Sequence, residues 1–148
     1  MLNKGYILML EGDEHDRELS RNYFNNLEVQ FELLKLSNEV IPFLKDKHTT
    51  GELPALILLT LNSVPDNGLD VLKQIKSVDA FKHIPVIILG EHTQEELIKE
   101  CYANGASTFI NKPFNISLTD LSIKTFVQYW FEVAQIPTPQ KLYNKSQS

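Results

Sequence analysis

The sequence lacks most of the features that mark secreted, membrane-embedded or nucleic-acid-binding proteins. Its single cysteine, Cys101, cannot form an internal disulfide, which is typical of the reducing cytoplasm. Its apolar runs are far shorter than the roughly 20 residues that a helix needs to cross a bilayer. The net charge is −5, and the densest basic stretch, residues 45–48, is interrupted by Asp46, whereas nucleic-acid phosphates require clustered Lys and Arg. We therefore expect a cytoplasmic protein that binds neither a membrane nor nucleic acid.

The composition that is present is that of an ordinary globular domain. The chain has 148 residues, of which 43% are hydrophobic and 22% charged, which is enough to bury a core. Apolar runs that suit strands alternate with stretches of helical periodicity. Strands are expected at residues 6–10, 29–36, 53–61, 84–90 and 106–111, and helices at residues 14–24, 37–47, 68–78, 93–102 and 123–134. We assign residues 1–136 to one domain and residues 137–148 to a polar tail.

This alternation predicts an α/β fold with a doubly wound, five-stranded parallel sheet. For such a pattern the flavodoxin-like (βα)5 arrangement, with strand order 2-1-3-4-5, is the leading choice. Ligands of these sheets bind beyond the carboxyl ends of the strands. The candidate site therefore consists of the residues at those ends, which are Glu11, Gly12, Asp13, Thr60, Gly90 and residues 111–113.

Several stretches at the strand ends resemble the receiver domain of two-component response regulators. Residues 105–115, GASTFINKPFN, are similar to the end of that family's fifth strand, with its Lys-Pro-aromatic signature. Residues 54–76 resemble the third strand and the loop and helix after it, with Asn62 and Gly68 at the expected spacing. Residues 127–137, VQYWFEVAQIP, more narrowly resemble the regulators that partner phytochromes. The likeness covers nearly the whole chain.

This resemblance implies a phosphotransfer site that the sequence no longer completes. In the family an aspartate after the third strand accepts a phosphoryl group, and this chain has Thr60 there. Of the two acids that help to hold Mg²⁺, the second is replaced by Gly12. The hydroxyl residue after the fourth strand, which hydrogen-bonds the phosphoryl group, is replaced by Gly90. The phosphorylation chemistry is therefore expected to be disabled, with no catalytic residue, metal or cofactor.

Other receiver positions are retained. The resemblance places Glu11 at the first acid, Lys112 at the phosphoryl-pairing lysine and Phe109 at the aromatic switch position. It also implies a cis bond before Pro113, and Asn62 would offer its backbone carbonyl. Glu11 and Lys112 are interpreted as a structural ion pair rather than as catalytic groups. Thr60 is interpreted as a β-branched residue that suits a buried strand end, in preference to a target of a Ser/Thr kinase.

These observations favour an atypical single-domain response regulator that is not an enzyme. With no effector domain, its output would run through binding to a protein such as a sensor histidine kinase or a phytochrome-like receptor. The alternative is a weak phosphoacceptor that uses Asp13 or Asp66 in place of Thr60, with Mg²⁺ held by Glu11 and Asp13. A third interpretation, a flavodoxin-like nucleotide binder, fails because no Gly-rich phosphate loop follows the first strand.

Two further patterns lie in the helices expected after the fourth and fifth strands. Thr93 and Glu96 predict a capping box for the helix after the fourth strand. Tyr129, Trp130 and Phe131 lie in a row on the last helix, and consecutive helical residues point about 100° apart, so one core face cannot bury all three. Exposed aromatics of this size usually mark an interface. We therefore expect a homodimer that involves this helix.

Overall fold

The fold is described by a computed structural model that covers residues 5–111, 124–125 and 127–137. The strands are β1 (Ile7–Leu10), β2 (Phe31–Leu34), β3 (Leu56–Thr60), β4 (Val86–Gly90) and β5 (Thr108–Asn111). The helices are α1 (Glu14–Asn26), α2 (Val40–Thr50), α3 (Gly68–Lys76) and α4 (Glu95–Ala103), with a 3₁₀ turn η1 (Ser37–Glu39) and a π-helical turn η2 (Tyr129–Val133). The predicted tail, apart from Pro137, lies outside the described residues.

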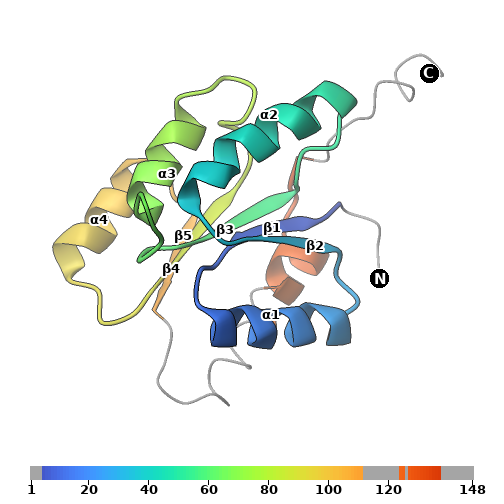
Figure 1. Cartoon of the computed structure of the whole chain (residues 1–148), viewed down its shortest axis with the longest axis horizontal. Coiled ribbons are helices and arrows are strands. Elements are labelled where there is room, and N and C mark those ends of the chain that lie inside the picture. Colours follow the sequence, from blue (N-terminus) through green and yellow to red (C-terminus); the bar gives the residue numbers. More distant parts are fainter. Residues whose placement is uncertain (1–4, 112–123, 126, 138–148) are drawn as a thin grey trace.

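The five strands form one parallel sheet in the order β2-β1-β3-β4-β5, as predicted (Figure 1). The central strand β3 pairs with β1 from Ile7↔Leu56 to Leu10↔Leu59 and with β4 from Ile57↔Val86 to Thr60↔Leu89. Every residue of β3 and β4 is buried, which accounts for their almost uninterrupted apolar sequences, since parallel strands covered on both faces need apolar side chains on both.

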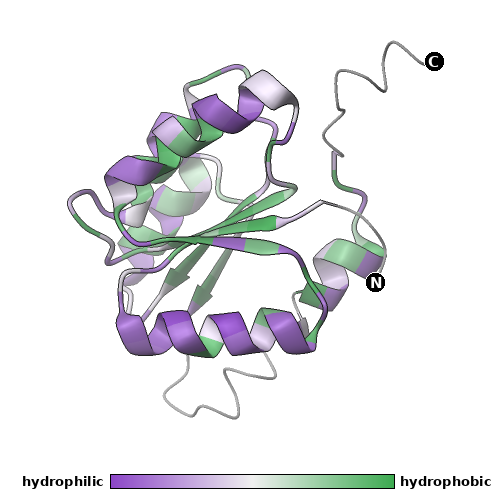
Figure 2. Ribbon diagram, turned by 45° about the vertical axis from the view of Figure 1, so that its right-hand side comes forward, coloured by the Kyte–Doolittle hydropathy of each residue, from purple (hydrophilic) through white to green (hydrophobic). Residues whose placement is uncertain are grey.

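Helices cover both faces of this sheet, so the fold has three layers. Helices α2, α3 and α4 lie on one face, and α1 lies with the C-terminal helical segment on the other (Figure 1). Side chains along β1 alternate between these two cores: Leu8 and Leu10 pack with α2 and α3, whereas Ile7 and Met9 pack with Phe24 of α1. The outward surface of α1 is mostly hydrophilic, while the strands are hydrophobic along most of their length (Figure 2).

Cys101 lies fully buried in the core beneath α4. Burial and the neighbouring Glu100 raise the pKa of its thiol. The side chain is therefore held as a neutral core residue, as its place on an apolar helical stripe predicted.

Two predicted helix ends are wrong. Helix α4 begins at Glu95 after Gln94, and no side chain caps it. The hydroxyl of Thr93 is turned toward the Glu91 carbonyl instead. At the other end of the chain, η2 ends at Val133 as a π-helical turn rather than as a regular helix.

The aromatic row on η2 divides as the helical spacing predicted. Phe131 is buried against the sheet, Trp130 is half-buried, and Tyr129 is 52% exposed. Val133 is exposed as well. Ile123 and Phe126, which were expected on the buried stripe, lie outside the described residues.

Candidate functional site

The carboxyl ends of β1, β3 and β4 surround a cavity of about 400 Å³. Parallel strands end at the same edge of a sheet, so residues far apart in the sequence meet there. Its lining residues are Glu11, Gly12, Asp13, Asp16, Thr60, Asn62, Ser63, Val64, Leu89, Gly90 and Glu91. Of the predicted site residues that the structure describes, the cavity brings together Glu11, Gly12, Asp13, Thr60, Asn62 and Gly90.

Thr60 has a structural hydrogen bond in this cavity. The side chain is buried, and Oγ1 donates to the carbonyl oxygen of Leu10 at 3.0 Å. The last paired residues of β1 and β3 are Leu10 and Leu59. The hydroxyl therefore adds one more contact between the two strands where their backbone pairing ends. Its proton is directed at a carbonyl group, which cannot act as a general base.

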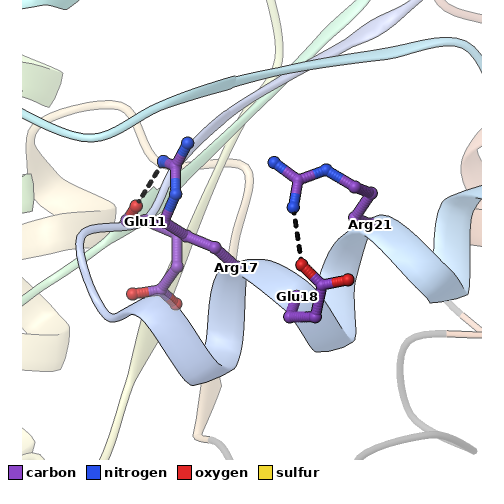
Figure 3. Close-up of polar contacts among 4 residues, drawn as sticks. All are labelled: Glu11, Arg17, Glu18 and Arg21. Atoms are coloured by element: carbon purple, nitrogen blue, oxygen red, sulfur yellow. Dashed lines mark hydrogen bonds and ion pairs between the residues drawn. The ribbon is translucent and has the colours of Figure 1, made fainter.

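Glu11 is fixed by its backbone and its side chain. Its carboxylate is buried and accepts a hydrogen bond from the backbone N–H of Asp13 at 3.2 Å. Nη1 of Arg17 donates to the Glu11 carbonyl oxygen at 2.9 Å. Figure 3 shows the guanidinium directed at this carbonyl and the Glu11 carboxylate turned away from it. Arg17 thus ties α1 to the end of β1, a role that no sequence motif indicated.

The two residues after Glu11 are also set by local geometry. Asp13 is the N-cap of α1, and its carboxylate accepts the backbone N–H of Asp16 at 2.9 Å. A Cβ added to Gly12 would lie 3.2 Å from the carbonyl oxygen of Lys35. A side chain at residue 12 would therefore crowd the end of β2, and Asp13 is engaged in starting a helix.

The loop after β3 forms one wall of the cavity and is held in place by hydrogen bonds to Ser37 of η1. Ser37 donates its backbone N–H to the Val64 carbonyl at 2.9 Å, and its hydroxyl accepts the Asp66 N–H at 2.7 Å. The hydroxyl of Ser63 donates to the Asp66 carbonyl at 2.9 Å. Asp66 is not among the lining residues, whereas Asn62 and Val64 are. Neither serine was a predicted site residue.

Part of the predicted site falls elsewhere. Lys112 and Pro113 lie outside the described residues, so their ion pair and cis bond stay predictions. The structure does describe a cis bond between Val64 and Pro65. Phe109 is half-buried and packs against the core on the α3 side of the sheet. Across the described ranges, no group of three His, Cys, Asp or Glu side chains is arranged to hold a metal ion.

Residues 7–123 match the family described as the response regulator receiver domain. The chain belongs to this family. With the receiver fold, it is a response regulator receiver of two-component signalling, a class of generally non-enzymatic domains that interact with kinases or other signalling proteins. No helix within the described part of this receiver is long and apolar enough to cross a membrane.

Curated relatives and solved structures agree with this assignment. The receiver is 25% identical to the probable methanogenesis regulatory protein FilR2 of Methanothrix harundinacea, over 90% of this chain and 88% of that protein. It is also 25% identical to response regulator Rcp1 of Synechocystis, over 88% of this chain and 92% of that protein. The chain is also similar to the structure of the phosphorylated cyanobacterial phytochrome response regulator RcpA, with 27% identity and a TM-score of 0.84. The match covers 90% of this chain and 99% of the RcpA chain.

Proposed function

We propose that this receiver acts by binding another protein, without phosphorylation of Thr60, the last residue of β3. The observation that carries the proposal is the buried hydrogen bond from the Thr60 hydroxyl to the Leu10 carbonyl. A hydroxyl is neutral at pH 7 and needs an adjacent base to become a nucleophile. Here the acceptor of its proton is a backbone carbonyl, so Thr60 serves the fold rather than phosphotransfer.

The acidic side of the cavity supports the same conclusion. Mg²⁺ needs near-octahedral oxygen coordination, and residue 12 supplies no side chain to it. Asp13 caps α1 with one of its oxygens. The receiver therefore has no phosphoryl transfer to catalyse and needs neither metal nor cofactor for its function.

The partner in this proposal is a sensor histidine kinase or a phytochrome-like receptor. Similarity to RcpA and Rcp1 supports the second class, because RcpA is a phytochrome response regulator by name. Such partners place the receiver in the cytoplasm. Genes beside its own that encode a kinase or photoreceptor would identify the partner most directly.

One observation favours an alternative, a weak phosphoacceptor receiver. Asp13 lines the cavity and is exposed, and the similar protein RcpA is described as phosphorylated. In that alternative Asp13 or Asp66 accepts the phosphoryl group while Mg²⁺ is held by Glu11 and Asp13. Asp66 has the weaker position, since it lies outside the cavity lining.

A phosphodonor experiment separates the two functions. The protein is incubated with acetyl phosphate and Mg²⁺, and its intact mass is measured. We expect no gain in mass. The positive control is the double variant Gly12→Asp/Thr60→Asp, which restores two carboxylates and should regain Mg²⁺ binding. Without the metal this variant should lose thermal stability, because like charges then crowd one site. A stoichiometric phosphoryl group on the native chain, absent from Asp13→Asn or Asp66→Asn, would establish the alternative.

We also propose that η2 is a homodimer interface. Tyr129 and Val133 are 52% and 72% exposed, and the Tyr129 ring stands edge-on to Trp130. A symmetric pairing would bury this apolar surface twice. Sedimentation should show a dimer that Val133→Glu dissociates, whereas Val64→Glu, an equally exposed apolar position at the cavity, should leave it intact. A monomer at high concentration of the native protein would contradict the proposal.

A further inference from the structure

The amino end of the sheet, opposite the cavity, carries a cluster of basic residues. Helices α2 and α3 both end there and lead into the strands β3 and β4. Lys47 and His48 lie in the last turn of α2, and Lys76 lies in the last turn of α3. Lys82 and His83 follow in the loop before β4. These five residues, which we call the basic cluster, come from three segments that the parallel sheet brings to one edge.

Lys76 fastens the loop before β4 to the end of α3. Its Nζ donates to the carbonyl oxygens of Lys82 and Ile84 at 2.9 and 2.8 Å. These two carbonyls flank His83 along the chain, and both Lys82 and His83 are exposed. The ammonium group thus fixes the backbone that carries two further basic side chains at the surface.

His48 of α2 meets the same loop. Its ring stands edge-on to the ring of buried Phe81, with the centroids 6.0 Å apart. Partial burial, followed by the charges of Lys76 and His48, lowers the pKa of His83. Neighbouring basic groups act on a pKa in this way because they disfavour one another's charged forms. Carboxylates bound at this cluster would relieve that repulsion.

The positive charge at this end exceeds what the helix ends require. Basic residues in a last turn offset the partial negative charge of a helix C-terminus, which accounts for those of α2 and α3. Lys82 and His83 lie beyond the end of α3, and Lys82 pairs with exposed Asp79 at 3.1 Å. Residues 45–52 and 73–84 together hold five lysines and two histidines against three acids, Asp46, Glu52 and Asp79, although the whole chain has a net charge of −5.

We propose that the basic cluster is a docking surface for an acidic segment of a partner protein. Charge complementarity supports this occupant, and the interspersed Asp46 and Asp79 keep the cluster below the dense Lys and Arg charge that nucleic acid requires. The proposal rests on the proposed function, because it says where a receiver that works by protein binding takes its partner and what chemistry the partner presents. Protonation of His48 and His83 strengthens the docking as pH falls below about 6.5.

The first test is a titration of isotope-labelled protein with hexaglutamate, followed by NMR at low salt. Amide shifts should concentrate in residues 45–52 and 73–84, and hexaglutamine, the uncharged control, should cause none. Lys82→Gln should weaken binding about threefold, the scale of one exposed ion pair. The matched control is Lys99→Gln, because Lys99 is exposed and pairs with Glu95 as Lys82 pairs with Asp79; its affinity should equal that of the native protein. Shifts spread over the whole surface, or equal weakening by the two variants, would overturn the proposal.

The second test uses pH. Glutamate side chains stay mostly charged at pH 5.5, since their ordinary pKa is about 4.3, whereas His48 and His83 gain protons. The affinity for hexaglutamate should rise about threefold from pH 7.5 to pH 5.5, and the double variant His48→Gln/His83→Gln should show no rise. A rise of the same size in the double variant would overturn the proposal.

Two comparisons separate this proposal from its neighbours. Tighter binding of phosphatidylserine vesicles or of a single-stranded oligonucleotide at the same residues would replace the acidic protein segment by a membrane or by nucleic acid, and so refute the proposal. Acetyl phosphate with Mg²⁺ tests the proposed function in the same samples. A gain in mass with the hexaglutamate shifts intact would refute the proposed function alone, whereas absent shifts without a gain in mass would refute the docking surface alone.

Discussion

Replacing Thr60 by Val tests whether the last residue of β3 serves the fold. Valine keeps the β-branched shape but removes the hydroxyl that donates to the Leu10 carbonyl at 3.0 Å. A buried hydrogen bond contributes about 1 kcal/mol net, and a buried acceptor left unpaired costs about 1–3 kcal/mol. We expect the free energy of unfolding to fall by about 1–2 kcal/mol, and the melting temperature of a domain of this size to fall by about 2–8 °C.

The assay is urea unfolding followed by circular dichroism, with Thr49→Val as the matched control. Thr49 lies in α2 and donates its hydroxyl to the Asp46 carbonyl at 2.6 Å, but it is exposed. Water can replace that bond, so the control should change stability by no more than about 0.5 kcal/mol. A Thr60→Val protein as stable as the native one would refute the structural role of the hydroxyl.

Two further predictions concern the residues around this edge and the opposite end of the sheet. Arg17→Met should lower the free energy of unfolding by about 1–2 kcal/mol, because it removes the hydrogen bond to the Glu11 carbonyl. Arg21→Met breaks only an exposed ion pair and should cost less than about 1 kcal/mol in the same urea titration. Equal losses in the two variants would contradict the role assigned to Arg17. Partial burial, followed by the charge of Lys76, lowers the pKa of His83, so the unfolded state binds its proton first and this group lowers stability as pH falls below about 6.5. Unfolding at pH 7.5 and pH 5.5 should therefore show a smaller acid loss of stability in His83→Gln than in the native protein, and an unchanged acid loss would count against this linkage.

The sheet could be predicted because its information is local. Residues 53–61 and 84–90 are apolar at nearly every position, and the structure buries β3 and β4 throughout. The strand order was the leading choice for alternating strands and helices with right-handed connections, and the structure confirms it. The positions of Glu11, Thr60 and Gly90 at strand ends followed from the same pattern.

The contacts that shape the cavity could not be predicted, because they join distant residues through side chains. The Thr60 hydroxyl reaches a carbonyl 50 residues away in the sequence, and the Ser37 hydroxyl reaches an N–H 29 residues away. The capping box predicted at Thr93 did not form either: the helix begins one residue later, after Gln94, and the Thr93 hydroxyl is turned toward the Glu91 carbonyl. Beyond the π-helical turn, Ile136 is buried and Ala134 is only partly so.

The anchoring of the loop after β3 has a consequence for how fast a partner can bind. Ser37 holds this loop at the Val64 carbonyl and at the Asp66 N–H. Ordering a loop during association costs free energy and slows the encounter when a rearrangement is needed. These hydrogen bonds to buried Ser37 are part of the folded domain itself, so the loop needs no partner to hold it in place. A partner that contacts exposed Val64 therefore binds a loop that is already ordered. Its affinity depends on how well its own surface fits this loop and on its rate of dissociation.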